Sequence, residues 1–427
     1  MKKVFNFVFG AVAALLCIVA CQKNVATPEL QDGEHGLVVV SVNPEYSTKA
    51  DGAAVDAEKA ESAIRSLQVF VFYGESNAAL GQVAYAKETD RYETFTGTAS
   101  SQNMTLTTTT GKKYVYALVN APRLTNVTDV TDLKGRVLYL GNNYLAPTTV
   151  GSESRLGLVM AGAYGYTSGD AQINVDGSII EIGAYTQGLD ASITSVPINM
   201  YRLPARIELQ NIKVDFRGTW LEGLNFTVKE IYLKNIPNGV NFTGQNSTLL
   251  SDSGYWTNKI TREASPVDKS SLNVAPLVYE LRASGGTACS VAGVDTPMSS
   301  FFYTYPNSNT VDQTADAWSQ RRTRLVIHAV ISGTNSLGAD FGSGKDYYYP
   351  ISIAKPEAFV ADGSSTPASS PTHTQIVGNH KYVVNRITIT GLGKPNDDND
   401  SVPESGRAKV EVSVQDWNGT TVLNYEF

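Results

Sequence analysis

Short runs of β-branched and aromatic residues recur along the whole chain, and this pattern constrains the fold most. The runs that best fit strands are Leu37–Val42, Leu67–Tyr73, Lys113–Val119, Arg206–Val214, Leu224–Lys234, Arg324–Ser332 and Tyr347–Ile353. Clusters of Gly, Asn, Asp, Ser and Thr separate them, as is typical of turns. Only Val127–Leu138, with Thr128 and Asp129 as candidate caps, indicates a short helix. We therefore predict an all-β chain built of β-sandwiches.

Three segments allow more detailed expectations. Leu67–Tyr73 is mostly apolar, which predicts a strand buried on both faces. Arg206–Val214 alternates in its first half, which predicts one face in water. Thr105–Thr110 is of low complexity and is expected to be an exposed loop or a sheet edge.

The length of the chain suggests two or three domains. Pro197–Pro204 lies between a strand-rich first half and the new strand at Arg206, so we place a boundary there. The predicted divisions are 1–20, 21–49, 50–200 and 201–427.

The N-terminus has the features of an export signal. Lys2 and Lys3 precede Val4–Ala20, an uncharged stretch that is shorter than the roughly 20 apolar residues of a membrane span. Small residues then lead into Cys21, as in the lipobox of bacterial lipoproteins, in which the cysteine carries lipid. The alternative is an ordinary signal peptide with an incidental cysteine.

Charge and cysteine content exclude several classes of protein. The formal net charge is −7 and no basic stripe occurs, which argues against nucleic-acid binding. Cys17 would leave with the signal, so only Cys21 and Cys289 remain, and a disulfide framework is not expected.

No sequence motif points to catalysis or to a cofactor. The chain lacks HExxH, GxSxG and Walker patterns, and structural roles are expected for its four histidines, His35, His328, His373 and His380. Asp397–Asp400 offers hard oxygens for calcium, but no EF-hand spacing surrounds it, which favours a solvated acidic linker. We expect a non-enzymatic protein without metal.

The last fifty residues suggest a strand that can leave its own domain. A strand pattern over Val383–Thr390 is followed by an acidic loop and a second run over Ala408–Trp417. An extracellular chain can polymerise by lending such a terminal strand to a neighbour. The candidate donor residues, which alternate along two period-2 faces, are Val410, Val412, Val414, Leu423, Tyr425 and Phe427. We expect part of Ala408–Phe427 to complete its own domain and Thr420–Phe427 to be the exchanged segment.

Four blocks spread along the chain resemble the major fimbrial subunits, the fimbrillin family of Bacteroidetes type V pili. They are the lipobox at Cys21, Ile64–Gly74, Gly111–Ala121, and the terminal pair Asn379–Gly393 with Val410–Trp417. The resemblance implies two transthyretin-like β-sandwich domains and a role in surface fibres, adhesion and biofilm formation.

The resemblance also implies a maturation sequence. A lipidated precursor would reach the outer membrane, and a trypsin-like protease would remove the first strand, represented here by Leu37, Val38, Val39, Val40 and Val42. Cleavage would fall at Lys49, where relatives often carry arginine, with Arg65 as the alternative. The vacated groove would accept a strand from another copy.

The implied partners are other copies of the chain, together with tip and anchor subunits. Tip and anchor roles for this chain are alternatives to a shaft role. A different alternative is a surface glycan-binding lipoprotein that stacks sugars on Trp220, Trp256 or Trp318.

Overall fold

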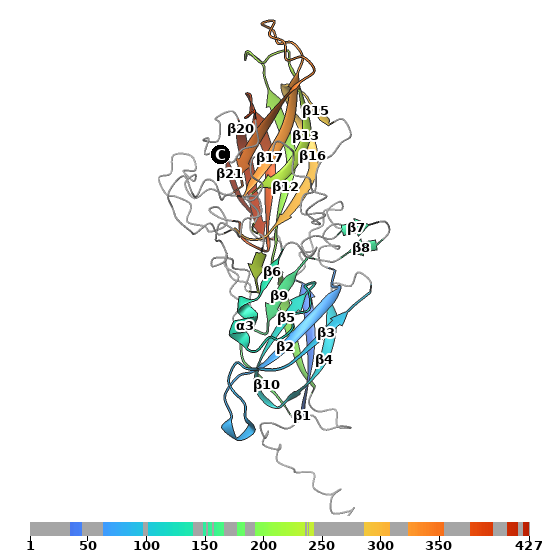
Figure 1. Ribbon diagram of the computed structural model, residues 1–427, viewed down its shortest axis with the longest axis vertical. Helices are drawn as coiled ribbons and strands as arrows, with labels where there is room; N and C mark the ends of the chain where they lie inside the picture. Colours follow the sequence, from blue (N-terminus) through green and yellow to red (C-terminus); the bar gives the residue numbers. More distant parts are fainter. Residues whose placement is uncertain are drawn as a thin grey trace, which may run out of the picture.

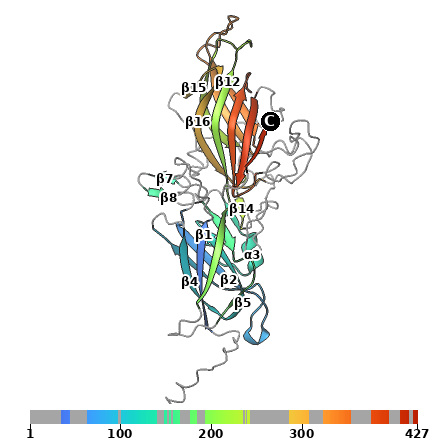
Figure 2. The same cartoon turned by 180° about the vertical axis from the view of Figure 1, so that it is seen from behind.

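In the computed structural model the strands form two bodies along the long axis of the molecule (Figures 1 and 2). The residues described are 35–44, 63–96, 101–139, 148–150, 153–155, 158–165, 177–183, 193–234, 237, 239–242, 286–307, 323–353, 376–395, 408–416 and 422–426. Within these ranges, helix is confined to α3 (Val130–Gly135) and the 3-10 turn η1 (Ala78–Leu80). The predicted all-β class is confirmed.

One eight-stranded sheet forms the lower body of Figure 1. Its strands are β1 (His35–Pro44), β2 (Ser66–Tyr73), β3 (Lys87–Thr94), β4 (Gln102–Thr109), β5 (Gly111–Val119), β9 (Met160–Ala163), β10 (Ile180–Ile182) and β11 (Ile193–Arg202). The order is β3-β2-β5-β9-β11-β1-β4, with β10 on β5. The terminal strands β3 and β4 also touch, so the sheet curls around one apolar core.

Two sheets form the upper body. Their strands are β12 (Ala205–Asp215), β13 (Asn225–Lys234), β15 (Thr287–Cys289), β16 (Ala292–Thr304), β17 (Arg324–Ser332), β18 (Lys345–Ser352), β19 (His380–Ile389), β20 (Ala408–Asp416) and β21 (Val422–Glu426). The sheet orders are β16-β12-β19-β20-β21 and β15-β13-β17-β18. Alternate residues of β12 and β13, such as Ile207 and Phe226, are buried in a shared core, as expected for a sandwich.

Two pairs of short strands lie outside the three larger sheets, and Phe242, which follows one of these strands, contacts the lower body. β6 (Val137–Tyr139) pairs with β14 (Gly239–Asn241), and β7 (Thr148–Val150) pairs with β8 (Glu153–Arg155). The Tyr201 hydroxyl donates to the Phe242 carbonyl at 2.9 Å, and the Tyr116 ring lies edge-on to Phe242.

Local expectations from the sequence are confirmed in the lower body. All of Leu67–Phe72 is buried, as predicted for a strand covered on both faces. The predicted short helix is α3, whose N-cap Asp129 accepts a hydrogen bond from the Asp132 amide at 2.8 Å.

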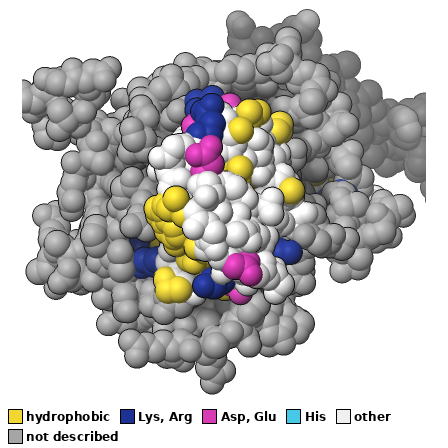
Figure 3. All heavy atoms as spheres, turned by 90° about the horizontal axis from the view of Figure 1, so that it is seen from above, with side chains coloured by type: hydrophobic (Ala, Val, Ile, Leu, Met, Phe, Trp, Pro, Cys, Tyr) yellow, Lys and Arg dark blue, Asp and Glu magenta, His cyan; other side chains and the backbone are white. Residues whose placement is uncertain are grey.

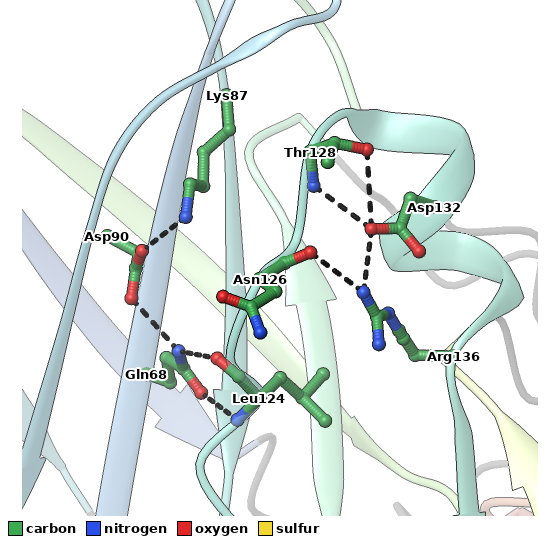
Figure 4. A network of polar contacts seen from close by, with 8 residues as sticks. All are labelled: Gln68, Lys87, Asp90, Leu124, Asn126, Thr128, Asp132 and Arg136. Atoms are coloured by element: carbon green, nitrogen blue, oxygen red, sulfur yellow. Dashed lines mark hydrogen bonds and ion pairs between the residues drawn. The ribbon is translucent and has the colours of Figure 1, made fainter.

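A polar network holds β2 and β3 to the segment that leads into α3 (Figure 4). The Gln68 side chain exchanges two hydrogen bonds with the Leu124 backbone, each of 2.8 Å, and also donates to Asp90. Arg136 donates to both Asp132 and the Asn126 carbonyl at 2.9 Å. The Gln68 bonds join β2 to β3 and to this segment, Arg136 fastens the segment to α3, and all of these residues lie outside β1.

Candidate strand-exchange site

The predicted removable strand, β1, lies inside the lower sheet and not at its edge. It pairs parallel with β11, where Val40 is opposite Val196, and antiparallel with β4, where Val40 is opposite Met104. Its backbone is therefore hydrogen-bonded along both sides. Removal of β1 would open a slot between β4 and β11 with unpaired backbone groups on two edges.

The side chains of β1 alternate as expected from the sequence. Val38, Val40 and Val42 are almost completely buried, with exposed fractions of 0%, 0% and 1%, whereas Leu37 and Val39 on the other face are half-buried. The three valines complete a core formed with β2, β4, β5, β9, β10 and β11. Full burial of a valine contributes roughly 1.5–3 kcal/mol, so an empty slot would be strongly unfavourable.

Among the described strands, β4 ends the sheet order, and its ladder partner is β1. The low-complexity segment Thr105–Thr110 thus forms a sheet edge, one of the two expected possibilities. Met104 and Leu106 of β4 are buried in the same core as the valines of β1. If β1 left, β4 would have to be held by side chains alone.

Glu88 of β3 makes side-chain contacts of this kind with β4. Its carboxylate accepts hydrogen bonds from the Thr108 hydroxyl at 2.7 Å and from the Thr109 amide at 2.6 Å. The Lys113 ammonium lies 2.8 Å from the same carboxylate, and the two side chains are only 1% and 8% exposed. Lys113 also donates to the Thr109 hydroxyl at 2.8 Å. This buried pair fastens β4 to β3 and β5 at the end of the slot where β1 begins, since His35 is opposite Thr109.

The two candidate cleavage sites differ in their surroundings. Lys49 lies outside the described residues. Arg65 directly precedes β2, and its amide donates to the Asn120 side chain at 2.7 Å while its carbonyl accepts from the Phe95 amide at 2.8 Å. The preceding Ala63 and Ile64 are buried. The backbone around Arg65 is thus integrated into the lower body.

The C-terminal strands lie at one edge of the upper body. β20 pairs with both β19 and β21, so the run containing Val410, Val412 and Val414 is an internal strand of its own sheet. Within the described part of the chain, β21 ends the sheet and pairs with β20, placing Leu423 opposite Val414 and Tyr425 opposite Val412. Phe427 and the lipidation candidate Cys21 lie outside the described residues.

Strand directions relate the two candidate elements. β11 ends at Arg202 beside the junction between the bodies, and β1 runs parallel to it, so β1 points from the lower end toward the junction. β12 runs from the junction toward the upper end, and β19 is parallel to β12. β20 is antiparallel to β19, and β21 is antiparallel to β20. β21 therefore runs toward the upper end, and both strands point the same way along the molecule (Figure 1).

The histidines that the structure describes have structural surroundings. His35 is exposed at the start of β1. The His380 ring is hydrogen-bonded to the Gly378 carbonyl through Nδ1, at 2.7 Å. The His328 ring stacks on Tyr348 with centroids 4.5 Å apart and lies 2.8 Å from Asp346. Burial lowers the pKa of His328, but the carboxylates of Glu230 and Asp346 outweigh this effect, so its pKa is raised. His373 lies outside the described residues.

The remaining candidates from the sequence can be placed only in part. Trp220 is 49% exposed, whereas Trp256, Trp318 and Asp397–Asp400 lie outside the described residues. Cys289 is buried, and burial raises the pKa of its thiol. Across the described ranges, no group of three or more His, Cys, Asp or Glu side chains is arranged to hold a metal, and no helix is long and apolar enough to cross a bilayer.

One comparison with known proteins concerns the lower body. The family profile described as "Major fimbrial subunit protein (FimA)" matches residues 37–202, which run from within β1 to the end of β11. This part of the chain is similar to the FimA family. The resemblance noted from the sequence is thereby confirmed, and β1 is part of the FimA match.

The likeness to FimA proteins continues beyond the matched region. The chain is 24% identical over 441 residues to "Major fimbrium subunit FimA type-3" of Porphyromonas gingivalis, with 98% of each sequence covered. It is 23% identical over 444 residues to a type-2 FimA of the same organism, again with 98% coverage of both. A crystal structure of a fimbrilin (FimA) from P. gingivalis W83 has the same fold, with a TM-score of 0.51, 15% identity, and coverage of 90% of this chain and 98% of that one.

Proposed function

We propose that this chain is a shaft subunit of a cell-surface fimbria that polymerises by exchanging β1 for the C-terminal strand of another copy. The observation that carries the proposal is the position of β1. It is a central strand with three buried valines, yet it lies at the N-terminal limit of the FimA-family region and its removal need not interrupt the rest of the fold. An internal strand that precedes a cleavage site creates a defined acceptor slot.

The direction of β21 supports its role as donor. A β21 segment that extends from the upper end of one copy into the lower end of the next would run in the direction of β1. The donor would keep the parallel relation to β11 and the antiparallel relation to β4. Because every contact joins the upper end of one copy to the lower end of another, the assembly is an open head-to-tail filament.

The choice of β21 over β20 follows from pairing. Withdrawing β21 breaks its hydrogen-bond ladder with β20. Withdrawing β20 breaks its ladders with both β19 and β21 and removes the strand that covers one edge of β19. The tail Thr420–Phe427 also carries Leu423, Tyr425 and Phe427 at period-2 spacing, which matches the spacing of Val38, Val40 and Val42.

Cleavage at Lys49 is favoured over cleavage at Arg65. A protease must draw an extended substrate segment into its active site, and the hydrogen bonds of Arg65 to Asn120 and Phe95 oppose this. The precursor would be anchored to the outer membrane through lipid on Cys21 and released for assembly by a trypsin-like protease. In the fibre, the shaft would join tip and anchor subunits, and the fibre would mediate adhesion and biofilm formation.

The test is assembly of purified precursor after limited digestion with trypsin. We expect fibres from the parent protein and from Lys59→Ala, a matched control at another basic residue that precedes β2. Lys49→Ala should remain a monomer that retains β1. Fibres of normal length from Lys49→Ala with β1 still attached would contradict strand exchange.

A further inference from the structure

The large hydrophobic side chains exposed in the described residues lie toward the two ends of the long axis. Leu80, Val83 and Tyr85 belong to the loop between β2 and β3, at the lower end of Figure 1, and are 45%, 64% and 51% exposed. We call them the lower patch. Trp220 and Leu337, 49% and 77% exposed, belong to the β12–β13 and β17–β18 loops at the upper end, and we call them the upper patch.

Two further exposed side chains follow the same distribution. Ile179 precedes β10, whose Ile180 is opposite Lys113 near the lower end. Val294 is opposite Val214 near the upper end. The view from above shows hydrophobic side chains at the surface of the upper end among charged ones (Figure 3). Exposed apolar surface concentrated in patches is typical of interaction sites.

The upper patch is held in place by a buried side chain. Asn335, only 5% exposed, donates to the Trp220 carbonyl at 2.7 Å and accepts from the amides of Leu337 and Ala339 at 3.1 and 2.7 Å. The Ser336 amide also donates to the Glu222 carbonyl at 2.6 Å. These bonds lock the β12–β13 and β17–β18 loops together, so Trp220 and Leu337 form one preorganised surface.

The lower patch is also ordered. Asn77 and Gln82 exchange backbone hydrogen bonds of 2.9 and 3.0 Å, and the Asn77 side chain accepts from the Ala79 amide at 3.2 Å. Gly81, with φ of 68°, closes the turn between Leu80 and Gln82. The Tyr85 ring stacks on Tyr114 with centroids 5.5 Å apart. The loop thus presents Leu80 and Val83 outward at fixed positions.

We infer that the upper patch of one copy packs against the lower patch of the next copy in the fibre. This inference rests on the proposed function, because strand exchange brings the upper end of one copy to the lower end of another. The two patches lie at those ends, and each alone leaves preorganised apolar side chains in water. The patch contact therefore adds a second interface to the inserted donor strand and limits rotation of one subunit about that strand.

The test places charges at the patches and measures the rate of fibre elongation. Val83→Asp and Leu337→Asp should each slow elongation about tenfold, as expected for the loss of an interface anchor. A double variant with both substitutions should be slower still, because two carboxylates then face each other wherever two copies meet. The double variant Val83→Asp with Leu337→Lys opposes unlike charges and should elongate faster than the like-charge pair. Gln210→Asp, at an exposed position of β12 between the ends, is the control and should have the parent rate.

A separate measurement distinguishes this inference from strand exchange itself. A synthetic peptide of the sequence of Thr420–Phe427 should bind the protease-treated subunit, and the patch variants should bind it as tightly as the parent does. Normal peptide binding together with parent-like elongation of every charged variant would overturn the patch contact and leave strand exchange intact. Failure of the peptide to bind the parent, with no fibres formed, would overturn both.

Discussion

Glu88 and Lys113 form a buried ion pair, 2.8 Å long, at the end of the slot that β1 occupies. Glu88 also binds Thr108 and Thr109, so the pair connects β3 and β5 to β4. An acceptor slot must keep both of its walls while it is empty. This pair gives the β4 wall a fastening that does not depend on β1.

The pair predicts a large difference between two neighbouring lysines. Lys113→Met leaves the Glu88 carboxylate buried without its cation and should lower the free energy of unfolding by about 3–5 kcal/mol. Lys112→Met removes an ion pair with Glu75 whose side chains are 45% and 48% exposed, and should cost about 1 kcal/mol or less. Urea denaturation of the two precursor variants measures the difference, and equal losses would contradict the role given to Lys113.

Val40 provides a test that separates the precursor from the mature subunit. Val40→Ala removes two methyl groups from a fully buried site and should destabilise the precursor by about 2 kcal/mol. Val39→Ala, on the half-buried face of β1, should cost less. Because strand exchange discards β1, fibres made from Val40→Ala should melt at the parent temperature. A lowered fibre melting temperature would show that β1 is retained.

Deletion of 420–427 should leave a folded, exported subunit that cannot polymerise. β20 keeps its ladder with β19, so circular dichroism of the truncated chain should remain that of a β-protein. The chain retains an acceptor slot but lacks a donor, and it should cap growing fibres of the parent protein. Normal-length fibres from the truncated chain alone would exclude this segment as the donor, and an unfolded product would show that it completes its own domain.

His328 predicts a pH dependence of stability in the upper body. Its pKa is raised in the folded state by the carboxylates of Glu230 and Asp346, so the protonated ring stabilises the fold. This stabilisation is fully present below the unfolded pKa of about 6.5 and is lost as the pH rises through the raised folded pKa. In His328→Gln the melting temperature should depend less on pH across this range. A pH profile of the melting temperature that is the same as that of the parent would contradict the assignment.

Local patterns in the sequence predicted much of the fold. The apolar character of Leu67–Phe72 and the alternation of Val38, Val40 and Val42 are set by which face of a strand meets the core, and both were confirmed. Other features depend on long-range pairing. The domain boundary near Pro197–Pro204 stays a prediction, and Pro197 itself lies within β11, opposite Ser41 of the distant strand β1.

The same limit applies to the candidate site. The position of β1 between β4 and β11 depends on segments far apart in the chain, and no local period encodes it. The Glu88–Lys113 pair was missed for the same reason. The available signal was Lys113 itself, a charged residue at the start of an otherwise apolar run, which requires a buried partner.

N-terminal sequencing of subunits taken from assembled fibres tests the central claim most directly. Strand exchange predicts a single mature terminus at Ala50, directly after Lys49, with β1 absent from every subunit of the shaft. A terminus at Ser66 would move cleavage to Arg65 and preserve the mechanism. A terminus before Leu37 would show that β1 remains in place, and it would contradict polymerisation by strand exchange.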